Sequence, residues 1–336
     1  MREKGFCRMR ILLLSNQPER TTRLLMFKAT LTSQGQEVIV PRFSSHDWLD
    51  IARQAREVLR KEKPDVVHLF NVPDIIFHGL GKLKGSCYKK LIYDYRSPWG
   101  VELQMSFGPL ARPAGEHFER ELAAASDLIT AVNRPLAEKV STYIQRKNKP
   151  LFIVNNYPEK SFLDKCRASP GPDGDKPLVF MGRISRQEGI ANLLRLIRRI
   201  PDQTFWIIGD GPFSRWYLRG LPKNARFFGW QPHDKVAGLI SQARICLIPH
   251  KRSLLTPYAT DRSVWKLNEY LLLGKVVVAS GVTEEETRKN LMIVEPEDLE
   301  QTVRENLKRE PEKLLPEDYR FWDRNDPIIK EVYESL

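Results

Sequence analysis

The feature that most constrains the fold is an alternation of short apolar runs with longer segments of helical spacing. Residues 47–62 are typical of the longer segments, with Ile51, Ala55 and Leu59 on one stripe. In the first half the apolar runs are residues 10–15, 37–40, 65–70, 90–96, 128–132 and 151–156. Because repeated β-α-β alternation implies parallel strands covered by helices, we expect a parallel sheet here.

The alternation stops near the middle of the chain and then restarts. The stretch "RASPGPDGDKP" (167–177) is rich in Pro, Gly and Asp, which indicates a loop or linker. Apolar runs resume at residues 178–182, 204–209, 225–229, 245–249, 276–280 and 291–294. The sequence therefore predicts an α/β protein of two Rossmann-like domains facing across a cleft: residues 1–157, a linker at 158–177, and residues 178–318. Ligands of such folds bind beyond the carboxyl ends of the strands, at helix N-termini.

The charge balance narrows the choice of partner. The net charge of +12 suggests nucleic acid, anionic lipid or phosphorylated small molecules. The cysteines are scattered without a C-x-x-C pair, which favours a reduced, cytoplasmic chain; they are Cys7, Cys87, Cys166 and Cys246. No stretch approaches the ~18–20 apolar residues of a membrane span, so we expect any membrane contact to be peripheral.

Two glycine turns follow strands in the second half. Gly182 and Arg183 end the run at 178–182, and a guanidinium there suits a diphosphate, although a surface arginine after a turn glycine is the plainer interpretation. Gly209 and Gly211 follow the next run but lack the third glycine of a dinucleotide fingerprint. They permit close backbone approach to a ligand, or a tight strand-to-helix turn.

The stretch "YATDRSVWKLNEYLLLGKVVVAS" (258–280) places two acids around a helix start. We expect Ser263 as the N-cap and Gly274 just past the C-terminus. At 100° per residue, Glu269 points away from the core stripe of Val264, Leu267 and Leu271. Asp261, in the loop before the helix, can then line one pocket together with Glu269.

This arrangement fits a ligand with a diphosphate in the middle and hydroxyl-rich rings at both ends. The helix N-terminus, Lys266 and Arg183 suit phosphate oxygens. The carboxylates of Asp261 and Glu269 can accept hydrogen bonds from sugar hydroxyls. The alternative is a surface helix whose Lys266 and Glu269 form an i,i+3 ion pair worth a few tenths of a kcal/mol.

The second half resembles the C-terminal domain of retaining glycosyltransferases of GT-B fold, group four. The matching pieces occur in order: "FMGRISRQEG", "WIIGDGP", "ARFFGWQPHDKVAGLISQARICLIPH" and "DRSVWKLNEYLLLGKVVVAS". A weaker likeness runs through "PDVVHLFN" and "LIYDYRSPW". The closing "YRFWDRNDPIIKEVYE" resembles the last helix of the family, which implies that residues from about 319 to 336 pack back on the first domain.

The resemblance implies roles for several residues. An acid, seven intervening residues and a glutamate form the family's donor-site signature, and Asp261 and Glu269 fit it. Glu269 would bind the ribose hydroxyls and Asp261 the transferred sugar. Arg183 would hold the diphosphate, and Trp230 would lie near the base. Gly182, Gly211 and Lys266 complete the expected donor set.

The sequence departs from the family at two places. Glu188 stands where the family usually has a lysine, and a glutamate there cannot bind diphosphate. Arg186, Lys266 or a residue of the other domain would compensate, or transfer activity has been lost. The first domain lacks the common Gly-Gly turn after its first strand, and there Arg20 and Arg23 could supply positive charge to the cleft.

In the first domain, Asp94 and Arg96 follow the fourth apolar run and are expected to face the cleft. Asp94 would steer the acceptor hydroxyl or hold the sugar; the alternative is that it caps the following loop. His68 lies inside a strand pattern and is expected in the core.

The function implied by the resemblance is transfer of a sugar, with retained configuration, from a nucleoside-diphosphate-sugar to an acceptor hydroxyl. No metal and no cofactor are expected, and Arg183, Lys266 and the helix N-terminus would stabilise the leaving group. The acceptor would be a glycan or lipid of cell-surface synthesis, reached from the cytoplasm or as a peripheral protein at the inner membrane face. Alternatives are a nucleotide-sugar epimerase of the same fold and a non-catalytic nucleotide-sugar-binding partner subunit.

A nucleic acid partner is not expected. Basic residues such as those of "RLIRR" (195–199) are spread along helices, and no RNA-binding motif occurs. Docking on an anionic membrane, or holding an acceptor phosphate, is the expected use of the charge.

Overall fold

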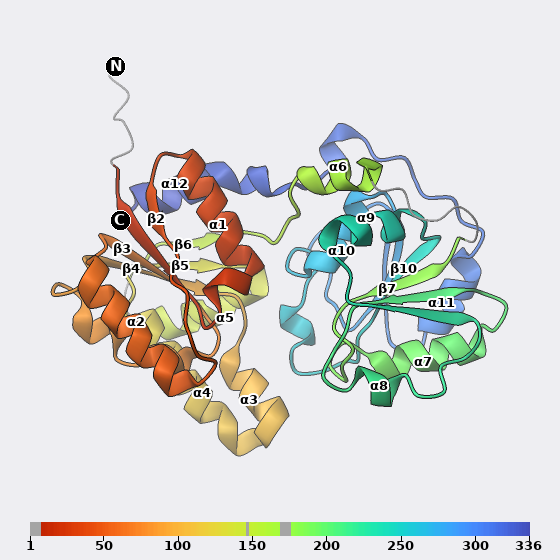
Figure 1. Ribbon diagram of the computed structural model, residues 1–336, viewed down its shortest axis with the longest axis horizontal. Coiled ribbons are helices and arrows are strands. Elements are labelled where there is room, and N and C mark those ends of the chain that lie inside the picture. The colour runs from red at the N-terminus through yellow and green to blue at the C-terminus, as the bar shows by residue number, and fades with distance from the viewer. Residues whose placement is uncertain (1–7, 146–147, 169–175) are drawn as a thin grey trace. The chain divides into compact units, whose positions relative to one another are not determined.

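The computed structural model describes residues 8–145, 148–168 and 176–336. The chain divides into two compact units (Figure 1). The first comprises Met1–Asn155 together with Asp323–Leu336, and the second comprises Asn156–Trp322.

The first unit contains a six-stranded parallel sheet in the order β2-β1-β3-β4-β5-β6. Each strand lies where an apolar run predicts one. Their bounds are β1 (Arg10–Leu14), β2 (Glu37–Ile39), β3 (Val66–Phe70), β4 (Lys90–Tyr95), β5 (Leu128–Ala131) and β6 (Leu151–Ile153). Strands β3 and β5 are buried along their whole length, which explains why they read as continuous apolar runs.

Helices cover this sheet. They are α1 (Thr22–Ser33), α2 (Trp48–Glu62), α3 (Trp99–Phe107), α4 (Arg112–Ala125), α5 (Arg134–Ile144) and α12 (Asp326–Glu334). Helix α2 buries Ile51, Ala55 and Leu59 as predicted, and Asp47 caps it by accepting hydrogen bonds from the Leu49 and Asp50 amides.

The C-terminal helix packs on the first unit. The Thr30 hydroxyl of α1 donates to Asp326 Oδ1 at 2.9 Å. The side-chain amide of Gln34 donates to the Asp326 backbone carbonyl at 3.1 Å. From the same helix, the Tyr333 hydroxyl lies 2.7 Å from Nδ1 of His68 on β3. His68 is fully buried, as predicted, and its ring stacks on Phe70 with 4.4 Å between centroids.

The second unit contains another six-stranded parallel sheet, in the order β12-β11-β10-β7-β8-β9. Its strands are β7 (Leu178–Met181), β8 (Phe205–Ile208), β9 (Ala225–Gly229), β10 (Ile245–Pro249), β11 (Val276–Ser280) and β12 (Leu291–Val294). Its helices are α6 (Ser161–Ala168), α7 (Ile190–Arg199), α8 (Ser214–Tyr217), α9 (His233–Ser241), α10 (Trp265–Leu272) and α11 (Leu299–Asn306). Two parallel sheets with covering helices confirm the predicted fold class.

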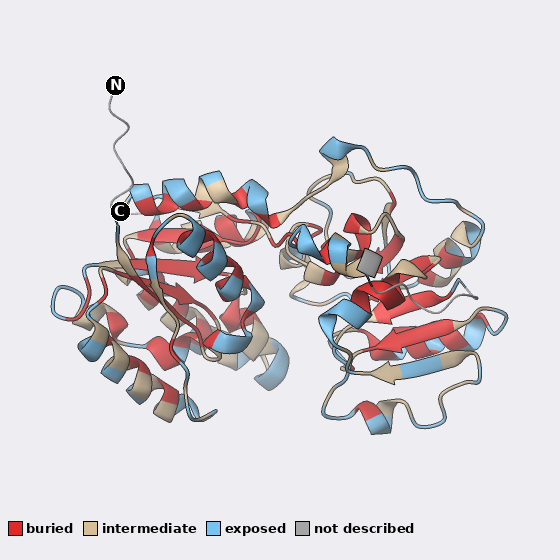
Figure 2. Cartoon of the chain, turned by 45° about the horizontal axis from the view of Figure 1, so that its top comes forward, coloured by how far each residue is buried: buried red, intermediate tan, exposed pale blue. Residues whose placement is uncertain are grey.

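The core of each unit lies on its strands, which Figure 2 shows largely as buried. The expected linker at 158–177 contains a helix, α6, which packs Phe162 into the core of the second unit. Residues 169–175 of the linker lie outside the described residues. Within the described ranges, no helix has both the length and the apolar content to cross a bilayer. Of the cysteines described, Cys87, Cys166 and Cys246 are free thiols; Cys7 lies outside these ranges.

Candidate functional site

The candidate site lies at the carboxyl ends of β7 to β10 in the second unit, beside the start of α10. The loops after β7 and β8 pack backbone against backbone. A Cβ on Gly209 would overlap the Gly182 carbonyl oxygen, and a Cβ on Gly211 would overlap that of Ile184. The glycines of the "GDG" turn therefore allow close packing between two loops of the site.

Glu188 forms a compact charged cluster with two residues from other elements. Lys266, in the first turn of α10, donates a short hydrogen bond to Glu188 Oε2, and His250 Nε2 lies 3.2 Å from the same oxygen. A Cβ on Gly182 would lie 3.1 Å from both the Lys266 ammonium and the Glu188 carboxylate, which places the cluster directly beneath the predicted diphosphate turn.

The cluster neutralises the charge that we expected Lys266 to offer to phosphate. Burial would raise the pKa of Glu188, but the Lys266 ammonium and the hydrogen bond from His250 lower it to about 2. Burial and the neighbouring Lys266 lower the pKa of His250, so its ring is neutral at pH 7. Lys266 itself is buried rather than exposed beside Glu269. Arg183, by contrast, is exposed at the end of β7.

Glu269 points away from the core, as predicted. Its Oε1 lies 3.1 Å from Nε2 of His233, the first residue of α9. The His233 ring packs against Phe162 at 4.9 Å between centroids. Trp230, in the short loop between β9 and α9, is 72% exposed. The sequence analysis did not single out His233. It could have been found from its position, because it lies three residues after Trp230 at the start of a helix.

Asp261 does not share a pocket surface with Glu269. It is fully buried, and its Oδ1 accepts a hydrogen bond of 2.6 Å from the Glu285 amide. Its Oδ2 is buried without a hydrogen-bond partner among the described residues, and burial raises the pKa of the carboxyl group. The reason is backbone pairing: the Thr283 amide donates to the Ala259 carbonyl at 2.8 Å, which draws the loop before α10 toward the loop after β11.

The start of α10 also differs from expectation. The helix begins at Trp265 with Val264 in the N-cap position, because the Ser263 hydroxyl is occupied in accepting from the Thr260 amide at 2.8 Å. Gly274 has φ +67° just past the C-terminus, as predicted. Asn268, which sequence reasoning also missed, is buried and donates to the carbonyls of Asn156 and Asp261.

In the first unit, Asp94 and Arg23 hold each other in the core. Arg23 Nη2 donates to Asp94 Oδ2 at 2.8 Å, and the Thr130 hydroxyl donates to the same oxygen at 2.8 Å. The exposed fraction of the side chain is 2% for Arg23 and 0% for Asp94. The expectation that both present charge to a cleft is therefore not met, because the pair is sealed beneath α1.

Of the two other arginines predicted on the acceptor side, Arg96 lies near this pair, close enough for Asp94 and Arg23 to influence the pKa of its guanidinium. Arg96 Nε donates to the Asn71 carbonyl, and the Arg96 amide donates to Asn71 Oδ1 at 2.8 Å. Burial lowers the pKa of its guanidinium. Arg20 is exposed at the turn before α1.

Comparison with known proteins agrees with the geometry of the second unit. Residues 164–305 match the family described as glycosyl transferases group 1. Among curated proteins, a lipopolysaccharide core biosynthesis glycosyltransferase of Rhizobium meliloti is 37% identical over 60 residues. That stretch is 16% of this chain and 17% of the relative, so the chain matches only a small part of it.

Solved structures resemble the whole chain at low identity. A sucrose-phosphate synthase of Thermosynechococcus elongatus has a TM-score of 0.66 at 16% identity, covering 97% of this chain and 94% of that one. HepE of Anabaena, solved with UDP and glucose, has a TM-score of 0.59 at 16% identity, covering 97% and 95%. A UDP-GlcNAc 2-epimerase of Methanocaldococcus jannaschii has a TM-score of 0.55 at 12% identity, covering 96% and 98%.

These likenesses define the class of protein. The chain has the GT-B fold of two Rossmann-like units, and residues 164–305, within its second unit, match the glycosyl transferases group 1 family.

Proposed function

We propose that the second unit binds a nucleoside-diphosphate-sugar and that the protein transfers its sugar to an acceptor hydroxyl. One observation supports this: the segment that matches the group 1 family, residues 164–305, contains Arg183, Trp230 and Glu269, which follow β7, β9 and β10 of one parallel sheet. The solved complex of HepE with UDP and glucose supports the choice of donor class.

The proposed donor contacts follow from the geometry. Glu269, on the outer face of α10, accepts hydrogen bonds from the ribose hydroxyls, and its contact with His233 fixes the carboxylate. The exposed indole of Trp230 lies against the base. Arg183 and the first-turn amides of α10 hold the diphosphate, which suits a helix N-terminus.

Lys266 can bind the diphosphate only if its ammonium group leaves the Glu188 carboxylate. In this structure its ammonium is bonded to that carboxylate. Asp261, being buried, acts as a positioning residue, since it fixes the loop after β11 through the Glu285 amide. Both assignments revise the direct catalytic contact expected for these two residues.

The proposed reaction retains the configuration at the anomeric carbon. The bond from that carbon to the β-phosphate oxygen breaks, and a bond to the acceptor oxygen forms on the same face. The acceptor proton passes to the leaving diphosphate. Arg183 and the α10 N-terminus stabilise the developing charge, without a metal ion.

The proposed setting is synthesis of a cell-surface glycan or glycolipid, at the cytoplasmic face of the membrane. The supporting observation is the short match to a protein named for lipopolysaccharide core biosynthesis.

An epimerase is the second candidate, because structures of UDP-GlcNAc 2-epimerases resemble this chain. The group 1 family match favours the transferase. A non-catalytic nucleotide-sugar-binding subunit differs from both in showing binding without turnover.

The test is a thermal-shift panel of UDP-, GDP-, ADP- and dTDP-sugars on the wild-type protein and on Glu269→Ala. We expect stabilisation by one base series that is lost in the variant. Absence of a shift with every nucleotide would contradict the proposal. Conversion of the stabilising sugar without an acceptor would favour the epimerase, and binding with neither conversion nor hydrolysis would favour the subunit.

A further inference from the structure

Three titratable side chains of the second unit meet at one oxygen atom, Oε2 of Glu188. The Lys266 ammonium donates to this oxygen, and Nε2 of His250 lies 3.2 Å from it. Glu188 comes from the turn before α7, His250 follows β10, and Lys266 lies in the first turn of α10. Their side chains are 30%, 16% and 10% exposed, so water screens them only weakly. A change in the charge of one group therefore alters the electrostatic energy of the other two.

The hydrogen bond between His250 and Glu188 determines where the His250 ring can accept a proton. An ionised carboxylate only accepts hydrogen bonds, so Nε2 of His250 carries a hydrogen and donates it. Nδ1 is then the nitrogen with the lone pair, and it has no hydrogen-bond partner among the described residues. Burial and the Lys266 ammonium lower the pKa of His250, whereas Glu188 raises it. In the described part of the chain, Lys266 of α10 and Glu188 of the turn before α7 are the charged groups that act on this pKa.

The two partners of Glu188 differ in their freedom to move. The backbone at His250 is held in place, because the Ser280 hydroxyl donates to the His250 carbonyl at 2.9 Å. Lys266 carries its charge at the end of a flexible four-carbon chain. Its ammonium lies 3.1 Å from the position that a Cβ on Gly182 would take, in the turn where we expect the diphosphate. Lys266 is thus the member of the cluster that can turn toward a bound diphosphate, while His250 stays beside Glu188.

We propose that a bound diphosphate draws the Lys266 ammonium away from Glu188, and that His250 then takes up a proton at Nδ1 and replaces the ammonium as the cation beside the carboxylate. This inference rests on the proposed donor site. If Lys266 moved alone, Glu188 would be left as a largely buried carboxylate without a cation, which is strongly unfavourable. Departure of Lys266 also removes a cation that lowers the pKa of His250 and leaves the carboxylate that raises it. The proton comes from solvent, and His250 is a positioning residue because it acts through Glu188 and Lys266.

The coupling gives donor binding a definite dependence on pH. The pKa of His250 lies below its ordinary value of 6.5 in the nucleotide-free protein and is higher when the donor is bound. Binding therefore takes up protons, so affinity rises as the pH falls through this range and declines as the pH rises. An uptake of about half a proton corresponds to binding that weakens roughly threefold for each unit of rising pH. The phosphates of a sugar nucleotide stay ionised throughout this range and contribute no proton.

The test is isothermal titration calorimetry of the full chain with UDP-glucose, GDP-mannose, ADP-glucose and dTDP-glucose at about pH 6.5, where a histidine titrates. Each titration is run in PIPES and in imidazole, two buffers that differ in ionisation enthalpy, so that the difference in heat gives the number of protons taken up. We expect the uptake of a fraction of a proton with the nucleotide sugar that binds. Equal binding enthalpies in both buffers, or proton release, would overturn the proposal and leave the donor site standing. Absence of binding by all four nucleotides would overturn both.

Variants assign the proton to His250. His250→Gln keeps a hydrogen-bond donor beside Glu188 but cannot gain a charge, so it should abolish proton uptake and flatten the pH dependence of binding. Lys266→Gln should also abolish the uptake, because His250 is then the cation of Glu188 before the nucleotide binds. His233→Gln should retain it, although that ring lies 3.1 Å from Glu269 in the same site. Uptake that persists in His250→Gln, or that disappears in His233→Gln, would contradict the proposal.

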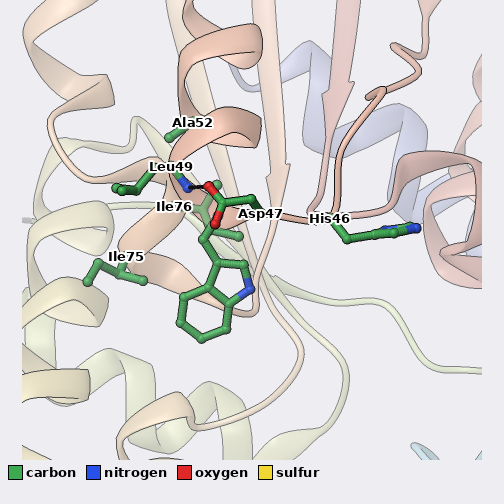
Figure 3. Close-up of a pocket in the computed structure, with 7 residues that line it drawn as sticks. His46, Asp47, Leu49, Ala52, Ile75 and Ile76 are labelled. Atoms are coloured by element: carbon green, nitrogen blue, oxygen red, sulfur yellow. Dashed lines mark hydrogen bonds between the residues drawn. The ribbon is translucent and has the colours of Figure 1, made fainter.

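The matched control is His46→Gln in the first unit. His46 is exposed, and it lines a pocket there while pointing away from the other side chains of that pocket (Figure 3). We expect this variant to match the wild type in affinity and in proton uptake, and a loss of uptake would place the titrating group outside the cluster. Circular dichroism melting curves report whether each variant is folded. If His250→Gln does not fold, Lys266→Gln provides the same test.

Discussion

At the scale of single residues, the identity of residue 188 decides the charge beside Lys266 in the proposed donor site. A lysine there would add to Lys266, whereas Glu188 bonds to it and neutralises it. His250 gives no compensating charge, because burial and Lys266 lower its pKa. Arg183, at the end of β7, and Arg186, in the loop that follows, are both exposed, and we propose that they supply positive charge to the diphosphate.

Glu188→Gln should therefore tighten binding of a nucleoside diphosphate. Removing the carboxylate frees the Lys266 ammonium for phosphate oxygens, and a charge-assisted hydrogen bond of this kind contributes about 1 kcal/mol or more, roughly fivefold in affinity. Isothermal titration calorimetry with the diphosphate found by the thermal-shift panel measures the change. Glu295→Gln, which removes an exposed partner of Arg252, is the control and should leave affinity unchanged. Unchanged or weaker binding by Glu188→Gln would contradict this assignment.

The buried Arg23–Asp94 pair predicts a stability effect rather than a catalytic one. Asp94→Ala leaves the Arg23 guanidinium in the core without its carboxylate, which typically costs about 3–5 kcal/mol. Urea unfolding measures it. Lys330→Ala, which breaks an exposed pair with Glu334, should change the free energy of unfolding by less than about 1 kcal/mol. A stable but inactive Asp94→Ala would instead place Asp94 in the chemistry.

Sequence reasoning reached some of these residues and not others. The departure at Glu188 and the outward direction of Glu269 follow from motif and helical angle. The partners of Glu188 and Arg23 lie 78 and 71 residues away in the chain, and no local pattern reports such pairings. The burial of Asp261 depends on backbone pairing between two loops, which periodicity does not address.

At the scale of elements, the loops at the carboxyl ends of β7, β8 and β10 are fitted to one another through glycines. Gly189, with φ +77°, is the N-cap of α7, and a Cβ there would overlap the Pro249 carbonyl oxygen at the end of β10. This contact fixes the distance between the turn that carries Glu188 and the strand that precedes His250.

Gly189→Ala should destabilise the protein much more than Gly220→Ala. Both positions have positive φ, which costs about 1–2 kcal/mol for alanine, but Gly220 at +69° has open space where Gly189 meets backbone. The overlap adds about 1–3 kcal/mol. Thermal unfolding followed by circular dichroism compares the two variants. Equal losses would show that the loop is free to move away.

The C-terminal helix makes the first unit sensitive to acid through His68. Burial lowers the pKa of His68 to about 3, against an ordinary value near 6.5. Its contribution to stability is thus fully present above about pH 6.5 and is lost as the pH falls from there toward 3. His68→Phe/Tyr333→Phe should reduce the fall in unfolding free energy between pH 7 and pH 4.5 by about 2–3 kcal/mol. Denaturant unfolding at pH 7 and at pH 4.5 measures this difference in unfolding free energy. The control is His117→Gln, which changes an exposed histidine. If the double variant loses as much stability between the two pH values as the wild type does, His68 is not responsible.

Most elements were predictable, and the exceptions have physical causes. Continuous apolar runs fix the strands, and α2 is strongly amphipathic, so that it runs from Trp48 to Glu62, within the residues 47–62 predicted for it. Helix α3 was missed because it follows the segment predicted as a loop after β4. Helix α6 was missed because it lies inside the expected linker, where the neighbouring Pro and Gly dominate the composition.

At the scale of the whole molecule, the two series of alternating apolar runs and helical segments correspond to two units, each with its own parallel sheet. The chain leaves the first unit at Asn155 and returns to it at Asp323, so the first unit is completed by the C-terminal helix. The proposed donor site is built from residues of the second unit alone.

Hydrogen exchange with mass spectrometry, in the presence and absence of the nucleoside diphosphate found by the panel, tests the central claim most directly. The account predicts that bound nucleotide slows exchange in peptides covering residues 182–189, 229–233 and 264–269, and leaves α2 of the first unit unchanged. Protection at other sites, or none at saturating nucleotide, would contradict a donor site at the carboxyl edge of the second sheet.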